Sequence, residues 1–160
     1  MSVNEHIKET AIKNNDLYRS EPKFPKQKLR LTLPLPLSVN HMYYNTRYGG
    51  KRLKKEAEDY IRTATSITLA AMEDEMWKMQ KDATWYYMDL LFYMPDRKTR
   101  DNHNMLKLLL DTLEGCAYHN DYYVMPNILG VELDAKNPRV EVILRPQTKK
   151  DREKAIKMFS

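Results

Sequence analysis

The sequence contains a single cysteine, Cys116, and only four glycines. One cysteine excludes an internal disulfide and a cysteine-rich zinc site, and it suits a reducing compartment. No apolar run approaches the ~20 residues needed to span a bilayer, and residues 1–5 contain no apolar signal core. Internal repeats and low-complexity tracts are also missing. These absences predict a soluble, cytoplasmic protein without a membrane partner.

The composition sets further bounds. A chain of 160 residues has the usual length of one domain, and 42% hydrophobic residues can form a modest core. The net charge is +5, a mild excess that favours a polyanionic partner without establishing one.

Three regions are expected. Residues 1–27 are polar and contain Pro22 and Pro25 near their end, which predicts a loosely attached arm with a short helix near Glu5–Lys13. This arm is either a contact to nucleic acid or a dispensable tail, and termini are more often the latter. Residues 28–146 form the domain, and residues 147–160 a charged tail of one or two helical turns.

Within the domain, hydrophobic periodicity predicts strands over 28–33, 84–94, 124–133 and 139–144, and helices over 53–79 and 102–114. The last two strands are expected to form a hairpin through 134–138. The fold class is therefore α+β, a small two-layer sandwich with a mixed four-stranded sheet and two main helices on one face.

Two basic segments are candidate DNA contacts. The predicted loop 36–52 is rich in tyrosine and carries Arg47, Lys51 and Arg52. Rings beside cations suit a sugar-phosphate backbone or unpaired bases; a solvated loop that packs its tyrosines locally is the alternative, and both stay open. The turn 96–100 carries a second set of cations that suits a phosphate, or is a plain exposed turn. These cations are Arg97, Lys98 and Arg100.

The helix over 102–114 carries the strongest chemical signal. His103, Lys107 and Asp111 follow one another at intervals of four residues and share one helix face. Asp101 is expected at the N-cap, where its carboxylate accepts backbone N–H groups. The buried face is expected to consist of Met105, Leu106, Leu109 and Leu113.

Asp121 follows the helix and the Gly115 that ends it. If Asp121 returns to the helix, two carboxylates, a histidine and a lysine converge on one site. A hard divalent cation held by carboxylates suits phosphodiester hydrolysis. The alternative is structural: Asp101 only caps the helix, Lys107 and Asp111 form a surface ion pair, and Asp121 is a turn residue.

Three blocks of sequence resemble the RusA family of Holliday junction resolvases over about Leu31 to Leu144. The first block is the loop 36–41, Pro-Leu-Ser-Val-Asn-His, which is similar to the family's Pro-x-Ser-x-Asn loop. The second, residues 100–113, resembles its Asp-x-Asp-Asn-x-x-Lys-x-x-x-Asp helix. The third, residues 115–124, resembles the block that ends in its third acidic residue.

The resemblance implies roles for individual residues. Asp101 and Asp121 match metal-binding catalytic aspartates, and Lys107 matches the catalytic lysine. Asn104 matches an asparagine beside the site, and Asp111 an aspartate that is structural or supports a metal ligand. The departure is a histidine where the best-known members carry another aspartate. This residue, His103, is expected to ligate a metal with a preference for Mn²⁺ over Mg²⁺, to bind a phosphate, or to reduce or abolish cleavage.

The resemblance further implies a homodimer that binds four-way junction DNA and makes two symmetric nicks with Mg²⁺, or with Mn²⁺. Two-fold symmetry suits a junction, since a dimer presents two equivalent sites to it. Two alternatives remain: a non-catalytic junction-binding protein, and a broader structure-selective nuclease acting on flaps or forks.

Overall fold

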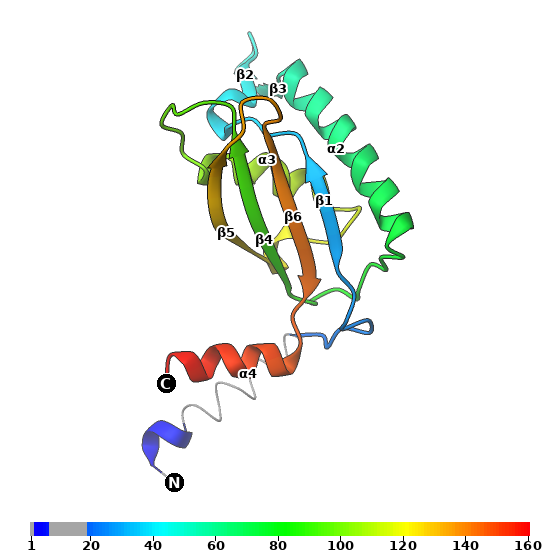
Figure 1. The fold of residues 1–160 in the computed structure, drawn as a ribbon, viewed down its shortest axis with the longest axis vertical. Helices are drawn as coiled ribbons and strands as arrows, with labels where there is room; N and C mark the ends of the chain where they lie inside the picture. The colour runs from blue at the N-terminus through cyan, green and yellow to red at the C-terminus, as the bar shows by residue number, and fades with distance from the viewer. Residues whose placement is uncertain (1, 7–18) are drawn as a thin grey trace.

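Strand β4, Tyr86–Met94, lies inside the sheet, and its side chains alternate between buried and half-buried positions. The computed structural model describes residues 2–6 and 19–160. The strand pairs with β5, Val124–Leu133, on one side and with β6, Arg139–Pro146, on the other. Strand β1, Leu29–Leu33, completes the sheet beyond β6 (Figure 1). The prediction of a mixed four-stranded sheet is confirmed.

The predicted hairpin between the last two strands is wrong. The sheet order is β1-β6-β4-β5, so β4 separates β5 from β6, and the loop 134–138 crosses the end of β4. The backbone N–H of Asp134 donates to the carbonyl of Met94, 2.9 Å away. The burial of the two strands explains this order. In β6 every second residue is buried, which suits an interior strand, whereas in β5 only Val124 is buried, which suits a strand at the edge of the sheet.

Helices α2, Lys55–Asp74, and α3, His103–Leu113, cover one face of the sheet. The expected apolar stripe of α2 is buried at Ala57, Tyr60 and Ala64. Three of the four residues expected on the buried face of α3 are buried, and Leu106 is half-buried against the core. The face of α3 opposite these buried residues is therefore directed toward solvent.

Helix α2 ends earlier than the predicted Met79. Met76 has a φ of 52°, in the left-handed region, which breaks the helical path. The Trp77 backbone N–H then donates to the Met72 carbonyl at 2.8 Å. The Trp77 ring is buried, and its Nε1–H donates to the Ala117 carbonyl, 2.9 Å away. The end of α2 is thus tied to the segment that follows α3.

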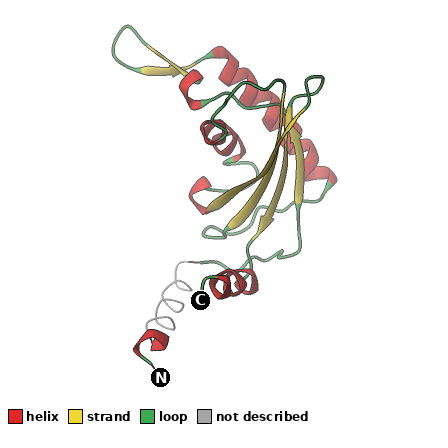
Figure 2. Cartoon of the chain, turned by 60° about the vertical axis from the view of Figure 1, so that its left-hand side comes forward, coloured by secondary structure: helices red, strands yellow, loops and turns green. Residues whose placement is uncertain are grey.

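The segment 36–52, predicted as a loop, contains regular structure. A 3-10 turn, η1, covers Val39–His41, and strands β2, Tyr43–Asn45, and β3, Lys51–Leu53, pair antiparallel as a hairpin. This hairpin extends away from the main sheet and its helices (Figure 2). Its pairing was missed because the segment lacks the alternating apolar pattern of a half-buried strand.

The C-terminal segment forms helix α4, Lys149–Met158, which is longer than the one or two turns expected. Thr148 and Asp151 form a capping box, in which each side chain accepts the other's backbone N–H. At the other end of the chain, residues 3–6 are helical, and the rest of the helix expected near Glu5–Lys13 lies outside the described residues. Across the described part of the chain, every helix is too short or too polar to cross a membrane.

Candidate active site

The N-terminal end of α3 carries the first acidic residue of the site. The Asp101 carboxylate accepts the backbone N–H of His103 at 3.0 Å, and so satisfies one of the free donors that begin a helix. Asn102 holds the N-cap position, one residue later than expected. The His103 Nδ1 lies 3.5 Å from Asp101, and both side chains are more than half exposed. Asp101 and His103 are therefore open to a ligand from solvent.

The first two sequence blocks meet at this end of α3. A cavity of about 570 Å³ is lined by the loop containing Asn40 and His41 and by Asp101, Asn104 and Met105. Sequence analysis named both blocks but did not predict this contact. It also missed His41 as a residue of the site. The only signal for His41 was its place at the end of the Pro-x-Ser-x-Asn loop.

Lys107 lies in the middle of the exposed face of α3. Its Nζ lies 2.9 Å from an Asp111 carboxylate oxygen, one helical turn further on. The hydrogen bond to Asp111 raises the pKa of Lys107, with smaller contributions from Tyr43 and Asp121. Lys107 is therefore a cation at neutral pH, and it lies within electrostatic reach of both the β2–β3 hairpin and the segment after α3.

Asp121 returns to the C-terminal end of α3. It begins a 3-10 turn, η2, Asp121–Tyr123, and its backbone N–H donates to Glu114 Oε2 at 3.0 Å. Gly115, with a φ of +83°, lets the chain reverse after the helix. Burial raises the pKa of Asp121, and the carboxylates of Glu114 and Asp111 raise it further, whereas Lys107 lowers it. Glu114 was missed by sequence analysis.

The candidate residues form two groups along one helix face. Asp101 and His103 pair at the beginning of α3, and Lys107, Asp111, Glu114 and Asp121 interact along its second half. In the described ranges 2–6 and 19–160, no group of three or more histidine, cysteine or acidic side chains is arranged to hold a metal ion. Metal binding by Asp101, Asp121 and His103 stays a prediction.

The donor chemistry nevertheless fits a hard divalent cation. Carboxylate oxygens are the ligands that Mg²⁺ and Mn²⁺ take, and Mg²⁺ needs few of them because it keeps several waters. Glu114 and Asp111 raise the pKa of Asp121 because like charges repel. A bound cation would offset that repulsion.

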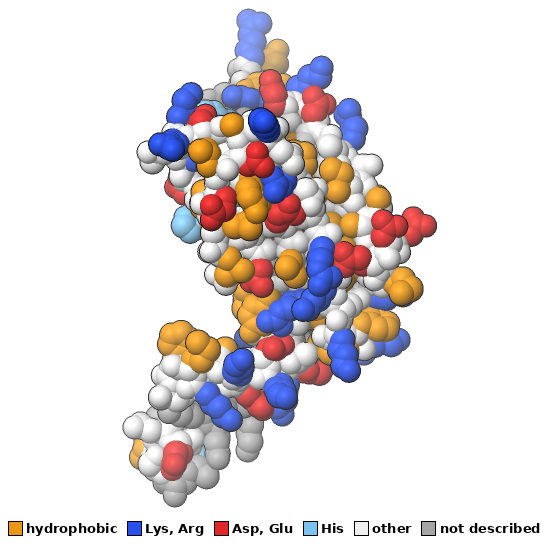
Figure 3. Space-filling view, in the orientation of Figure 1, with side chains coloured by type: hydrophobic (Ala, Val, Ile, Leu, Met, Phe, Trp, Pro, Cys, Tyr) orange, Lys and Arg blue, Asp and Glu red, His pale blue; other side chains and the backbone are white. Residues whose placement is uncertain are grey.

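The predicted DNA-contacting cations differ in exposure and in whether they already form an ion pair within the protein. Arg97 and Lys98 are exposed, whereas Arg100 makes a two-pronged ion pair with Asp96 and lowers the pKa of Asp96 to about 2. Arg47, Lys51 and Arg52 are exposed on the β2–β3 hairpin. Figure 3 shows Lys and Arg side chains at the end of the molecule where this hairpin lies, among Asp and Glu side chains, and others over its lower half.

Carboxylates, a lysine and flanking cations on one exposed helix face are the groups with which a hydrolase acts on a polyanion. The family model for the endodeoxyribonuclease RusA matches residues 32–145, which include all three sequence blocks and the whole sheet except Leu29–Leu31 of β1 and Pro146 of β6. The chain belongs to the RusA family of endodeoxyribonucleases. A search of curated proteins returns no match to the chain.

Proposed function

We propose that this protein is a divalent-metal-dependent endodeoxyribonuclease that resolves four-way DNA junctions by paired, symmetric nicks. The observation that supports this most directly is the position of Lys107. It lies on the exposed face of α3, within electrostatic reach of Asp121 and one helical turn beyond His103, and its charge is maintained by Asp111. A cation between carboxylates is suited to a phosphate that is being attacked by water.

In the proposed mechanism, Asp101 and Asp121 would hold a Mg²⁺ or Mn²⁺ ion, and His103 would complete or tune the ligand set. Such an ion would supply the charge that polarises the phosphate and lowers the pKa of a water. Lys107 stabilises the negative charge that develops on the phosphate oxygens. Asp111 orients Lys107, and Glu114 orients the backbone of Asp121.

Exposed cations extend the site to the neighbouring phosphates. Arg97 and Lys98 lie before α3, and Arg47, Lys51 and Arg52 lie on the hairpin. We further propose a homodimer, because two equivalent sites related by two-fold symmetry match the symmetry of a four-way junction and explain paired nicks.

His103 supports a second candidate, a protein that binds junctions without cutting them. Its side chain is 84% exposed and contacts Asp101 only at 3.5 Å, so it is a weaker substitute for the family's aspartate. A nuclease that cuts flaps and forks as well as junctions is the third candidate.

The test is incubation of a synthetic four-way junction with the protein and either Mg²⁺ or Mn²⁺, followed by sequencing gels. Symmetric nicks that Asp101→Asn and Asp121→Asn abolish while junction binding survives are the expected result. Asparagine keeps an oxygen that can cap His103, which limits structural damage. A stable complex without nicks in either ion establishes the binding-only candidate. Equal cleavage of junctions, flaps and plain duplex establishes the broader nuclease.

A further inference from the structure

The tip of the β2–β3 hairpin holds an aromatic ring almost entirely in solvent. Tyr48 is 94% exposed, more than any other tyrosine in the described part of the chain, whereas Tyr43 and Tyr44 in the strand below are 37% and 47% exposed. An exposed ring beside cations can serve as a platform on which a nucleic-acid base stacks. Whether Tyr48 can serve as such a platform depends on how the turn that carries it is held.

The turn that presents Tyr48 is braced on several sides. The Thr46 backbone N–H donates to the Gly50 carbonyl at 2.7 Å, and the Gly49 N–H donates to the Thr46 carbonyl at 3.1 Å. The Thr46 hydroxyl accepts the Gly50 N–H at 3.0 Å and lies 3.1 Å from the Gly50 carbonyl. Gly49 has a φ of +82°, which this closed turn requires. Tyr48 is thus displayed on a defined backbone.

The base of the hairpin is anchored in the protein. Met42, just before β2, is 1% exposed in the core, and its carbonyl accepts the Lys54 backbone N–H at 2.7 Å, just after β3. Leu53 packs against the same core. Tyr43 lies within electrostatic reach of Lys107. The hairpin is therefore anchored at its base, next to the face of α3 that carries Lys107.

The hairpin carries charge of one sign only. Residues 43–53 include Arg47, Lys51 and Arg52 and no acidic residue. Arg52 faces Tyr44 across the strand pair, and a hollow of about 550 Å³ is lined by Tyr44, Arg47, Tyr48 and Arg52. Cations beside aromatic faces are the chemistry that binds unstacked bases and their phosphates.

We propose that Tyr48 stacks on an unstacked base near the branch point of the DNA, while Arg47, Lys51 and Arg52 hold the adjoining phosphates. This inference takes its ligand from the proposed function and adds the residue that recognises the branch. Tyr48 lies five residues beyond Tyr43, a reach of at most about 17 Å at about 3.3 Å per residue. At about 3.4 Å per base step, this reach corresponds to about five base steps along the DNA from Tyr43.

The experiment places 2-aminopurine, in turn, at each position within five steps of the branch point. Its fluorescence is measured as the protein binds the junction in EDTA, so that the measurement does not depend on cleavage. Wild type and Tyr48→Phe are expected to change the fluorescence at the same position. Tyr48→Ala is expected to lose that change and to weaken junction binding by about 5- to 150-fold, the typical effect of losing one base–aromatic stack. Its affinity for plain duplex is expected to stay unchanged.

The matched control is Phe159→Ala, which removes a ring that is 91% exposed beyond α4. It is expected to leave both fluorescence and affinity unchanged, and thermal melting checks that each variant folds. The inference is overturned if wild type changes no probe, if Tyr48→Ala retains the signal, or if it loses junction and duplex affinity equally. Absence of nicking in Mg²⁺ and Mn²⁺ would overturn the proposed nuclease alone, because this test needs no metal.

Discussion

Glu114 accepts the backbone N–H of Asp121 at 3.0 Å and thereby holds the third sequence block against the end of α3. The two carboxylates are seven residues apart in the chain. Their proximity raises the pKa of Asp121 in addition to the effect of burial. This relationship connects the acidic residue after the helix to the face that carries Lys107.

Glu114→Gln is expected to lower the pKa of Asp121. The substitution removes a like charge, whereas the amide oxygen can still accept the Asp121 N–H, so the turn is kept. The measurement is a carboxyl ¹³C NMR titration without metal. Glu58→Gln, at an exposed position in the first turn of α2, is the control and should leave Asp121 unaffected. An unchanged or higher pKa of Asp121 in Glu114→Gln would contradict the contact.

His103→Asp is expected to raise the rate of junction nicking in Mg²⁺ relative to Mn²⁺. An imidazole favours the softer ion, and a carboxylate restores the hard oxygen ligand usual in the family. Rates are compared at equal concentrations of each ion, with His103→Asn as a neutral control. A ratio of the two rates that is the same in wild type and His103→Asp would show that residue 103 does not ligate the metal.

Tyr118→Phe is expected to lower the free energy of unfolding by about 1 kcal/mol, the typical value of one hydrogen bond. The buried Tyr118 hydroxyl donates to the Leu110 carbonyl at 2.8 Å and fixes the chain after α3. The Leu110 carbonyl keeps the Glu114 N–H as a donor, so it is not left unsatisfied. Urea unfolding measures the change. The exposed Tyr48→Phe should change stability by less than about 0.5 kcal/mol, and an equal effect of both would contradict the prediction.

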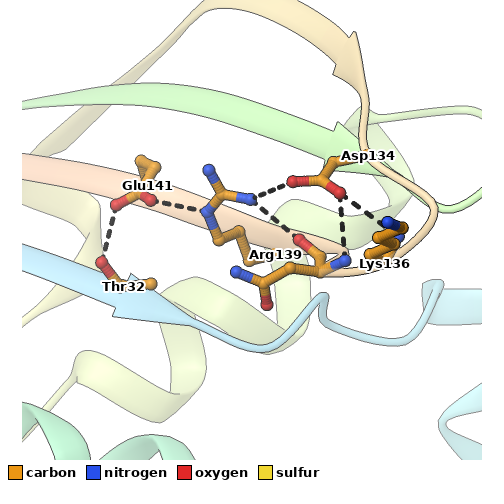
Figure 4. Close-up of polar contacts among 6 residues, drawn as sticks. Thr32, Asp134, Lys136, Arg139 and Glu141 are labelled. Carbon is orange, nitrogen blue, oxygen red and sulfur yellow. Dashed lines mark hydrogen bonds and ion pairs between the residues drawn. The ribbon is translucent and has the colours of Figure 1, made fainter.

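Arg139→Met is expected to destabilise the protein at neutral pH and to do so less as the solution becomes acidic. Arg139 forms ion pairs with Asp134 at 2.9 Å and Glu141 at 2.8 Å, while Glu141 also accepts the Thr32 hydroxyl (Figure 4). The hydrogen bond from Arg139 lowers the pKa of Asp134. Burial opposes the same change at Glu141, but the bonds from Arg139 and Thr32 outweigh it.

Carboxyl groups with lowered pKa values stabilise the folded state above their ordinary pKa values and lose that contribution as pH falls. The ordinary values are 3.8 for Asp134 and 4.5 for Glu141. The difference in unfolding free energy between wild type and Arg139→Met should therefore have its largest value above about pH 5 and become smaller as the pH falls below it. Urea unfolding at several pH values measures it, with the exposed Arg62→Met as control. A difference independent of pH would contradict the prediction.

Much of the fold could be predicted because burial leaves a periodic pattern. The apolar pattern identified β4, α2 and α3 as elements, and for α3 it also identified the buried face. The order of strands could not be predicted, since the short 134–138 connection suits a hairpin equally well. The placement of β6 beside β1 depends on which strand buries more side chains, and that is decided by the whole sheet.

The site was predictable where its residues share one helix. The spacing of His103, Lys107 and Asp111 placed them on one face, and the structure leaves that face open to solvent. His41 and Tyr43 could not be found in this way, because each approaches the face only through a turn or a hairpin. Glu114 is the C-cap of α3 and follows Asp111 by three residues, so the same spacing could have found it.

The sequence by itself determined the α+β class, the two helices and the candidate residues along α3, because local periodicity and spacing require only the geometry of one element. Tertiary structure alone decided that β4 lies between β5 and β6, that Asp121 meets Glu114, and that Tyr48 is displayed at the tip of an anchored hairpin. Those outcomes depend on contacts between residues far apart in the chain, whose energies arise only when the whole core is packed.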